Sequence, residues 1–472
     1  IGAARALPVG ERVVCAGRLM LMRVMGKATF GQLRDGTGQI QIHVKKDQIG
    51  DAAYDTFRKH NNAGDFLGVE GRLFLTHTNE LTISAEKLTI LSKAVRPLPE
   101  KWHGLTDPEI RYRERHLDLI SSEETRTIFV NRARIISSIR RVLDEDGYLE
   151  VETPVLCAQA GGASARPFIT HHNAYDSELF MRIATELPLK KLVIGGYDGV
   201  YEIGRIFRNE GVDTRHNPEF TTLEAYKAYS DYNGMADLVE RVFAACSALT
   251  GLETIDYNGM KINVKPPFRR LSLPDAWKAA TGEDIHAVLK GKAFDRAGLD
   301  RLASKLHIEH GEDTPSAKIF ERIFDEKIQK DLEQPTFVMD YPTAVTPLAK
   351  CRAGDESIVE RFEFFAGREE IANAYSELND PEDQRGRLVE QLRQKEEDHN
   401  SEADIMDGSF VEAMEYGMPP MGGIGIGIDR LAMLFSGRPS IREVILFPLL
   451  KQTEHTDAAP KEKKSGNVIN DL

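Results

Sequence analysis

The sequence contains few cysteines and no long hydrophobic run. Four cysteines occur among 472 residues, and they are widely separated, at Cys15, Cys157, Cys246 and Cys351. They form no CxxC pair and have no metal-ligand spacing, so we expect no structural zinc and a reducing, cytoplasmic environment. No apolar stretch approaches the roughly 20 residues of a membrane helix, and no segment is typical of a signal peptide. We therefore expect no membrane partner.

An excess of basic residues is also absent. The chain has 61 lysines and arginines against 74 aspartates and glutamates, which gives a net charge of −13. This balance excludes a protein coated with positive charge for nucleic-acid binding, although it allows a local basic patch. We accordingly expect no DNA partner.

The first 46 residues differ from this acidic average, because they hold eight basic residues and only two acidic ones. Residues 39–44 alternate between polar and apolar side chains after a glycine-containing turn at 35–38, and similar runs follow at 66–75 and 81–90. Several short strands with glycine turns predict a small barrel such as an OB-fold. A small β-domain with a solvated basic edge is the alternative.

The rest of the chain alternates between proline-rich, helical and strand-like segments. Residues 94–109 carry three prolines, which predict a linker. A capping box at 121–124 then precedes a helical apolar pattern. Strand-like alternation occupies 178–229 and 335–378, with helical patterns between them. This order predicts an α+β fold, an antiparallel sheet flanked by helices.

A first group of polar residues follows from period-two geometry along 200–226. Arg208 and Glu210 share one face of a strand, and Glu224 and Tyr226 share a face of the next. If the two strands pair as a hairpin, these four side chains form one polar surface beneath a loop that carries His216. Arginine suits bidentate contact with phosphate or carboxylate. A solvated hairpin with salt bridges is the simpler alternative.

A second group surrounds Ala366-Gly367, which we interpret as a two-residue turn. That turn would place Glu363 opposite Glu370. Carboxylates directly across a ladder repel each other, and a bound Mg²⁺ would remove the penalty. Two solvated glutamates are the alternative.

Three further polar residues follow Glu370 on strand positions of the opposite parity, at Asn373, Tyr375 and Glu377. For all four to reach one pocket, the strand needs a bulge near Ile371-Ala372.

A third group lies at 422–434, where glycines alternate along a predicted strand that leads into a helix. The missing side chains leave one face bare for a ligand or a neighbouring backbone. Arg430 falls at the start of the helix, where a negative ligand group is favoured. Close helix–strand packing alone would explain the glycines, but not the arginine.

In this order, the three groups resemble the three motifs of class II aminoacyl-tRNA synthetases, with 147–154, 207–220 and 425–430 similar to motifs 1, 2 and 3. An OB-like N-terminal domain is typical of the aspartyl, asparaginyl and lysyl enzymes. The segments 102–107, 161–173 and 373–380 are similar to lysyl-tRNA synthetases in particular, and the resemblance covers about residues 11–450.

The resemblance implies a function and a domain organisation. The chain would activate L-lysine with ATP to lysyl-adenylate and transfer it to the 3′ end of tRNA(Lys), as a homodimer that uses Mg²⁺. The implied segments are an OB-fold anticodon-binding domain at 1–95, a linker at 96–120, a catalytic domain at 121–451 with a helical insertion at about 235–332, and a disordered tail at 452–472.

The resemblance also implies residue roles. Lysine would be bound by Gly162, Glu186, Arg208, Glu224, Tyr226, Asn373, Tyr375 and Glu377. ATP would be bound by Arg208, Glu210, His216, Phe220, Glu370 and Arg430, with Arg208 and Arg430 catalytic. Mg²⁺ would be held by Glu363 and Glu370, and the anticodon read by Phe30 and Gln41. The surplus of acid agrees with a substrate that presents two ammonium groups and one carboxylate.

Three positions depart from the family pattern: Pro188 replaces an aromatic residue, Gly204 a polar one, and Arg368-Glu369 is shifted. Two other functions stay open from the residues. The first is a related ligase that lysylates a protein, although such relatives typically lack the anticodon barrel. The second is a non-catalytic RNA-binding protein, which the retained Arg208, Glu210 and Arg430 disfavour.

Overall fold

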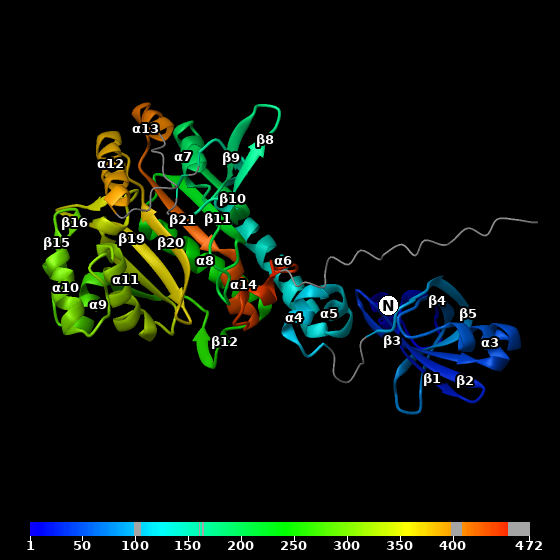
Figure 1. The fold of residues 1–472 in the computed structure, drawn as a ribbon. Helices are drawn as coiled ribbons and strands as arrows, with labels where there is room; N and C mark the ends of the chain where they lie inside the picture. The colour runs from blue at the N-terminus through cyan, green and yellow to red at the C-terminus, as the bar shows by residue number, and fades with distance from the viewer. Residues whose placement is uncertain (99–104, 160, 163–164, 398–407, 452–472) are drawn as a thin grey trace, which may run out of the picture. The chain divides into compact units, whose positions relative to one another are not determined.

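The computed structural model describes residues 1–98, 105–159, 161–162, 165–397 and 408–451, drawn in colour in Figure 1. The chain forms two compact units, Ile1–Ser121 and Ser122–Leu472. The tail predicted at 452–472 lies outside the described residues. Within the described residues, no helix has both the length and the apolar character needed to cross a membrane.

The first unit is a closed five-stranded barrel with the strand order β1-β2-β3-β5-β4. Its strands alternate between buried and exposed side chains, and the buried ones, such as Leu33 and Ile42, fill the interior. The predicted OB-fold is therefore confirmed. The elements are α1 (Gly2–Arg5), β1 (Arg12–Met25), β2 (Ala28–Asp35), β3 (Gly38–Lys45), α2 (Lys46–Ile49), α3 (Asp51–His60), β4 (Phe66–Leu75), β5 (Leu81–Ser92), α4 (Pro108–Arg113) and α5 (Arg115–Ser121).

The stretch predicted as a linker at 96–120 holds helices α4 and α5. Pro108 lies in the first turn of α4, where proline needs no hydrogen-bond partner, and Asp107 caps the helix by accepting a bond from the Glu109 amide. Arg115 and Asp118 form a buried ion pair at 2.6 Å within α5. The proline at this position therefore begins a helix instead of interrupting one.

The second unit is built on one large sheet of order β14-β17-β19-β20-β21-β11-β10-β6, with β18 paired to β19. The pairs β14–β17 and β6–β10 are parallel and the other pairs are antiparallel. Helices accompany the sheet, so the predicted α+β fold is confirmed (Figure 1). The strands are β6 (Leu149–Glu150), β7 (Leu156–Cys157), β8 (Ile169–His172), β9 (Ser177–Met181), β10 (Gly199–Phe207), β11 (Glu219–Ala228), β12 (Thr254–Tyr257), β13 (Met260–Asn263), β14 (Arg269–Ser272), β15 (Leu289–Lys290), β16 (Ala293–Phe294), β17 (Thr336–Pro342), β18 (Cys351–Arg352), β19 (Asp355–Ala366), β20 (Glu369–Ser376) and β21 (Met421–Gly427).

The helices of the second unit pack on this sheet or lie in the predicted insertion. Within the insertion, a second cluster of buried residues surrounds Trp277, whose ring stacks on Phe320 at 4.8 Å. The helices are α6 (Glu123–Glu145), α7 (Glu186–Ile194), α8 (Tyr232–Thr250), α9 (Leu273–Thr281), α10 (Arg296–Lys305), α11 (Ser316–Lys327), α12 (Pro381–Glu397), α13 (Gly408–Glu415), α14 (Ile428–Ser436) and α15 (Ile441–Val444), with short 3-10 turns η1 (Ile285–Val288), η2 (Gln329–Asp331) and η3 (Thr343–Val345).

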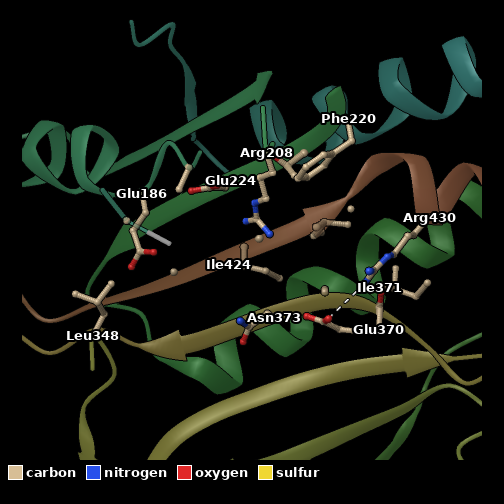
Figure 2. A pocket seen from close by; sticks show the side chains of 18 of the residues that line it. Glu186, Arg208, Phe220, Glu224, Leu348, Glu370, Ile371, Asn373, Ile424 and Arg430 are labelled. Atoms are coloured by element: carbon tan, nitrogen blue, oxygen red, sulfur yellow. Dashed lines mark hydrogen bonds and ion pairs between the residues drawn. The ribbon is translucent and has the colours of Figure 1, made fainter. Parts of the chain in front are cut away.

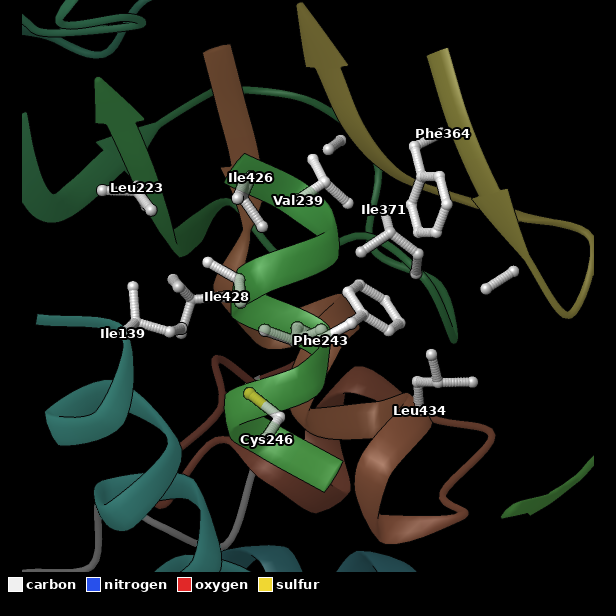
Figure 3. Packing of buried hydrophobic residues seen from close by; sticks show 14 of the residues in the cluster. Ile139, Leu223, Val239, Phe243, Cys246, Phe364, Ile371, Ile426, Ile428 and Leu434 are labelled. Atoms are coloured by element: carbon white, nitrogen blue, oxygen red, sulfur yellow. The ribbon is translucent and has the colours of Figure 1, made fainter. Parts of the chain in front are cut away.

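The main core lies between the sheet and the helices α6, α8 and α14 (Figure 3). Phe243 of α8 meets Phe364 of β19 edge to face, with ring centroids 5.1 Å apart. Ile426 of β21, Leu434 of α14 and Ile139 of α6 belong to the same buried cluster. Each fully buried side chain of this size stabilises the fold by about 1.5–3 kcal/mol relative to exposure.

Helix α6 begins one residue later than its predicted capping box. Ser122 is the N-cap, and its hydroxyl accepts a bond from the Thr125 amide at 3.1 Å. The predicted cap, Ser121, ends α5 and donates its hydroxyl to the Leu117 carbonyl at 2.8 Å. Because that hydroxyl is already used, the adjacent serine takes the cap.

The turn between β19 and β20 is Gly367-Arg368, not Ala366-Gly367. Both residues have positive φ, 63° and 67°, as a type I′ hairpin turn requires. Glu363 consequently pairs with Asn373, and the predicted pairing of Glu363 with Glu370 is wrong.

The predicted bulge is present. Phe365 pairs with Glu370 and Phe364 with Ala372, so Ile371 is the extra residue. The bulge changes the parity of the strand, which brings Glu370, Asn373 and Tyr375 to the same side of the sheet, where all three line one cavity.

A buried carboxylate connects three elements of the second unit. Asp429, in the first turn of α14, lies 2.6 Å from Arg132 of α6 and accepts a hydrogen bond from the Thr221 amide of β11 at 2.6 Å. A buried charge of this kind is costly unless it is paired. The contacts therefore fix the start of α14, including the next residue, Arg430.

Replacing Asp429 by asparagine should lower the free energy of unfolding of the second unit by about 3 kcal/mol, because Arg132 is left buried without its counterion. Urea denaturation followed by circular dichroism measures the loss. The matched control is Asp237→Asn, which removes an exposed ion pair to Arg270 and should cost less than about 1 kcal/mol. Equal losses in both variants would contradict the anchoring role.

Candidate active site

A cavity of about 720 Å³ opens in the second unit over strands β11, β20 and β21 (Figure 2). The hairpin β10–β11 pairs as predicted, with Glu202 opposite Glu224 and Ile206 opposite Phe220. Strand β21 lies between β11 and β20, so side chains of those two strands approach the cavity from both sides. Helices α7 and α14 close the cavity with Glu186 and Arg430.

The glycines of β21 form the floor. Gly425 is paired with Glu224 on one side and with Asn373 on the other. A Cβ atom at Gly425 would meet nothing closer than 4.0 Å, which shows an open floor. A Cβ atom at Gly423 would lie 2.0 Å from the Glu377 carboxylate, so only glycine fits beside that group.

Most of the predicted site residues lie around this one cavity, whereas Glu363 and Glu377 do not line it, and Phe30 and Gln41 belong to the first unit. The predicted residues that line the cavity are Gly162, Glu186, Arg208, Glu210, His216, Phe220, Glu224, Tyr226, Glu370, Asn373, Tyr375 and Arg430.

One end of the cavity is acidic. Glu224 accepts hydrogen bonds from the Thr185 amide at 3.4 Å and the Tyr226 hydroxyl at 3.3 Å. Tyr375 donates its hydroxyl to Glu186 at 2.5 Å. Burial, with a smaller contribution from the charge of Glu186, raises the pKa of Glu224 to about 7, and the hydrogen bonds only partly oppose this rise. The end of the cavity formed by Glu186 and Glu224 therefore suits a bound cation.

The sequence prediction missed Lys190, which lies between two carboxylates, those of Glu186 and Glu377. Its ammonium is 2.5 Å from Glu186 and 2.5 Å from Glu377. The spacing of Glu186 and Lys190, four residues apart on a helix, was the available signal, but it is also the spacing of ordinary surface pairs.

The other end of the cavity is basic. The guanidinium of Arg208 lies 5.3 Å from the centre of the Phe220 ring and donates to the Ile183 carbonyl at 3.4 Å. Burial lowers the pKa of Arg208, although nearby glutamates oppose the effect. Arg430 donates to the Glu370 carbonyl at 2.7 Å and lies 3.3 Å from its carboxylate (Figure 2).

The loop between β10 and β11 adds polar groups at the rim. His216 contacts Asp213 at 2.9 Å, and Arg215 contacts Glu369 at 2.9 Å. Glu369 is buried. Of the two residues at the shifted position of the family pattern, Arg368 is the second residue of the turn and Glu369 is the first residue of β20.

Glu363 does not line the cavity, but it pairs with Arg361, which does. Its carboxylate is 2.6 Å from Arg361 and accepts a bond from the Tyr341 hydroxyl at 2.8 Å. Burial raises the pKa of Glu363 to about 7; Arg361 opposes the rise and the charge of Glu370 adds to it. Among the described residues, no group of three or more acidic, histidine or cysteine side chains could hold a metal ion.

Two departures from the family pattern, Gly204 and Pro188, lie outside the lining of the cavity. A Cβ atom at Gly204 would lie 2.3 Å from the guanidinium of Arg182, which pairs with Glu202 at 2.5 Å; glycine makes room for that buried pair. Pro188 lies in the first turn of α7 and does not line the cavity.

The first unit presents an aromatic stack on its barrel. Phe30 of β2 is stacked on His43 of β3 at 4.2 Å with parallel rings, and Phe74 lies 5.8 Å beyond His43. Gln41 donates to Glu80 at 2.9 Å and accepts from Thr82 at 2.8 Å. The sequence prediction found Phe30 but missed His43, its partner across the ladder.

Comparison with known proteins agrees with this geometry. Residues 107–451 match the family model of class II tRNA synthetases (D, K and N), and residues 13–91 match that of the OB-fold nucleic acid binding domain. A lysine–tRNA ligase of Enterococcus faecalis is 50% identical over 444 residues, covering 94% of this chain and 88% of its own length.

Two further relatives are lysine–tRNA ligases of Staphylococcus aureus, 50% identical, and Thermoanaerobacter pseudethanolicus, 48% identical, each over 443 residues. These matches cover 94% of this chain and 88% and 87% of the relatives. The chain therefore belongs to the class II tRNA synthetases and, among them, to the lysine–tRNA ligase family.

Proposed function

We propose that this chain activates L-lysine with ATP, giving lysyl-adenylate and pyrophosphate, and then transfers the lysyl group to the 3′ end of tRNA(Lys). The observation that carries the proposal is one cavity with glutamates at one end and two arginines at the other. Free lysine has two ammonium groups and one carboxylate, so its charges match the cavity. The match with lysine–tRNA ligases along nearly the whole chain supports the same substrate.

The lysine side chain occupies the acidic end. Tyr226, Tyr375 and Glu377 bind the ε-ammonium, with Glu377 reached across the bare backbone of Gly423. Glu186 and Glu224 bind the two ammonium groups of lysine, and Asn373 and Gly162 complete the wall of the cavity. An aspartate substrate would leave these buried carboxylates without a counter-charge.

The nucleotide occupies the basic end. Phe220 stacks on the adenine, and Glu210 and His216 contact the nucleotide from the loop above. Arg208 lies between the acidic end and Arg430, so it can contact both the lysine carboxylate and the α-phosphate. Arg430 contacts the remaining phosphates.

The reaction needs charge neutralisation more than proton transfer. The lysine carboxylate is already ionised at pH 7, and its oxygen attacks the α-phosphorus directly. A carboxylate–phosphorus bond forms as the bond to pyrophosphate breaks, and the electron pair leaves with pyrophosphate. Arg208 and Arg430 hold the two anions together in line and stabilise the charge of the transition state.

Mg²⁺ would be held beside the nucleotide by Glu370, which lines the cavity, with Glu363 as the second carboxylate. Burial and the nearby charge of Glu370 raise the pKa of Glu363, a strain that a divalent cation relieves. Mg²⁺ uses one or two carboxylates and takes its other ligands from water and phosphate, so a pair of glutamates suffices. When bound, the ion neutralises the charge of the phosphates.

The homodimer and the cytoplasmic location are part of the proposal. Apolar side chains are exposed in and next to the motif 1 segment, at Leu149, Val155 and Leu156, and exposed apolar surface suits an interface. Sedimentation velocity tests the dimer, and a single monomeric species at micromolar concentration contradicts it.

The four cysteines are free, as in a reducing compartment. Cell fractionation tests the cytoplasmic location, and recovery of the protein outside the cytosol contradicts it.

Lysine-dependent exchange of pyrophosphate into ATP, followed by charging of tRNA, tests the function. Both activities are expected. Exchange without tRNA charging would favour a ligase that lysylates a protein, and no exchange would favour a non-catalytic RNA-binding protein. The OB-fold unit supports tRNA as the acceptor.

Replacing Glu377 by glutamine should raise the KM for lysine about tenfold or more and leave the KM for ATP within about twofold, because one charged partner of the ε-ammonium is lost. Pyrophosphate exchange measures both constants. Glu382→Gln, an exposed position on α12, is the matched control and should change neither. An unaltered lysine KM in Glu377→Gln would remove that residue from the site.

Lysine binding should weaken as the pH falls. Since Glu224 has a pKa of about 7 in the empty site, it is mostly ionised at pH 8 and mostly protonated at pH 6, and only the ionised form attracts an ammonium group. Burial raises the pKa of Glu377 to about 8, so this group loses its charge over the same range. Calorimetry without nucleotide or Mg²⁺ should therefore give a Kd for lysine at least about tenfold weaker at pH 6 than at pH 8. A Kd constant over this range, with circular dichroism showing an intact fold, would rule out the role of Glu224.

Replacing Phe30 by alanine should leave lysine-dependent pyrophosphate exchange intact and raise the KM for tRNA about tenfold or more. The reason is that stacking of a base on an aromatic side chain contributes about 1–3 kcal/mol. Aminoacylation with purified tRNA measures this effect, and the exchange activity of the same preparation is its control. A similar loss in both steps would contradict a purely RNA-binding role.

A further inference from the structure

Lys190 is a fully buried ammonium group for which the proposed reaction has no role. It lies on α7, and its side chain is 1% exposed. Its ammonium contacts the carboxylates of Glu186 and Glu377, each at 2.5 Å. Burial by itself lowers the pKa of Lys190, but the two carboxylates outweigh burial and hold that pKa above its ordinary value. Lys190 is therefore a permanent cation at neutral pH.

Aromatic rings surround this ammonium. It lies 5.7 Å from the ring centre of Tyr226, 5.5 Å from that of Tyr375 and 5.7 Å from that of Phe410. Cation–π attraction at these distances adds to the ion pairs. Tyr226, Tyr375 and Phe410 themselves line the cavity, so the same rings face Lys190 and the ligand space.

Lys190 does not itself line the cavity. Glu186 connects Lys190 with the cavity. Its carboxylate contacts the Lys190 ammonium and the Tyr375 hydroxyl, and its side chain lines the cavity. Glu377 is fixed from the same side by Lys190. Lys190 therefore acts on the site through the two acidic groups that it contacts.

Charge counting shows what this position does. Burial raises the pKa of Glu377 to about 8, and Lys190 opposes the rise. When the ammonium groups of a bound ligand keep all three ionised, the glutamates 186, 224 and 377 carry three negative charges, and Lys190 reduces the sum to two. The two ammonium groups of lysine then neutralise the acidic end completely, while the lysine carboxylate faces Arg208. Without Lys190, one buried carboxylate would stay unpaired, or would take up a proton and lose its attraction for the ligand.

We propose that Lys190 is a positioning residue of the lysine site, which fixes Glu186 and Glu377 from behind and sets the charge of the acidic end to match two ammonium groups. The proposal rests on the function proposed above. An ordinary buried salt bridge would affect only the stability of the fold, whereas a positioning residue also affects the binding of lysine.

The test compares Lys190→Met with Lys191→Met in the chain of both units. The two lysines are adjacent on α7, but Lys191 donates to the Ser409 hydroxyl, whereas Lys190 contacts Glu186 and Glu377. In pyrophosphate exchange, Lys190→Met should raise the KM for lysine about tenfold or more, with the KM for ATP within about twofold. Lys191→Met should change neither constant.

The pH dependence supplies a readout that a structural role would not move. Lys190 lowers the pKa of Glu377, so removing the ammonium raises that pKa, and tight lysine binding in Lys190→Met should require a higher pH than in the natural chain. Lysine Kd values from pH 6 to 9 measure this displacement. Lys190→Arg, which keeps the charge, should restore most of the affinity.

Two further outcomes are decisive. If Lys190→Met does not fold, the double variant Lys190→Met/Glu377→Gln removes both members of the pair. Its lysine KM should then exceed that of Glu377→Gln alone by about tenfold, because Glu186 has lost its fixed partner. Lysine KM values and pH profiles equal to those of the parent proteins would overturn the role of Lys190. An unsubstituted chain without lysine-dependent exchange would instead overturn the function itself.

Discussion

Three buried carboxylates lie at the acidic end, Glu186 and Glu224 on the cavity wall and Glu377 beside Gly423, and each buried negative charge needs a partner. Glu224 obtains partial relief from the Thr185 amide and the Tyr226 hydroxyl, whereas Glu186 and Glu377 depend on Lys190. The three acids come from α7, from β11 and from the end of β20. The fold must therefore keep a helix and two strands in fixed relation before any ligand arrives, because their mutual repulsion would otherwise separate them.

The sheet supplies that fixed relation. Strand β21 is hydrogen-bonded on both sides and separates β11 from β20, so the distance between their polar side chains is set by two ladders. Asp429 extends the same framework, since it connects α6, β11 and α14 and thereby places Arg430 at the opposite end. The acidic and basic ends are thus connected through one hydrogen-bonded sheet.

Period-two patterns were enough to predict the hairpin that places Glu224 opposite Glu202, and the need to gather polar residues predicted the bulge at Ile371. These features follow from local geometry. The turn at Arg368 could not be predicted in this way, because an arginine at positive φ is disfavoured and is held there by the surrounding structure. Lys190 was missed because a helical glutamate–lysine pair looks the same on a surface and in a core. Its meaning depends on Glu377, which is distant in sequence.

The bare floor of β21 has a consequence for variation in this strand. The boundary of the ligand space is main chain at Gly423 and Gly425, and main chain has no rotamers with which to adapt. Discrimination by shape at this surface is consequently independent of side-chain rearrangement. Any replacement of these two glycines inserts atoms into the chamber or into the Glu377 carboxylate, whereas Ile424 and Ile426 belong to the hydrophobic cluster and can exchange with other apolar residues of similar volume. In this part of β21, substitutions are thus tolerated at Ile424 and Ile426 but not at the glycines between and before them.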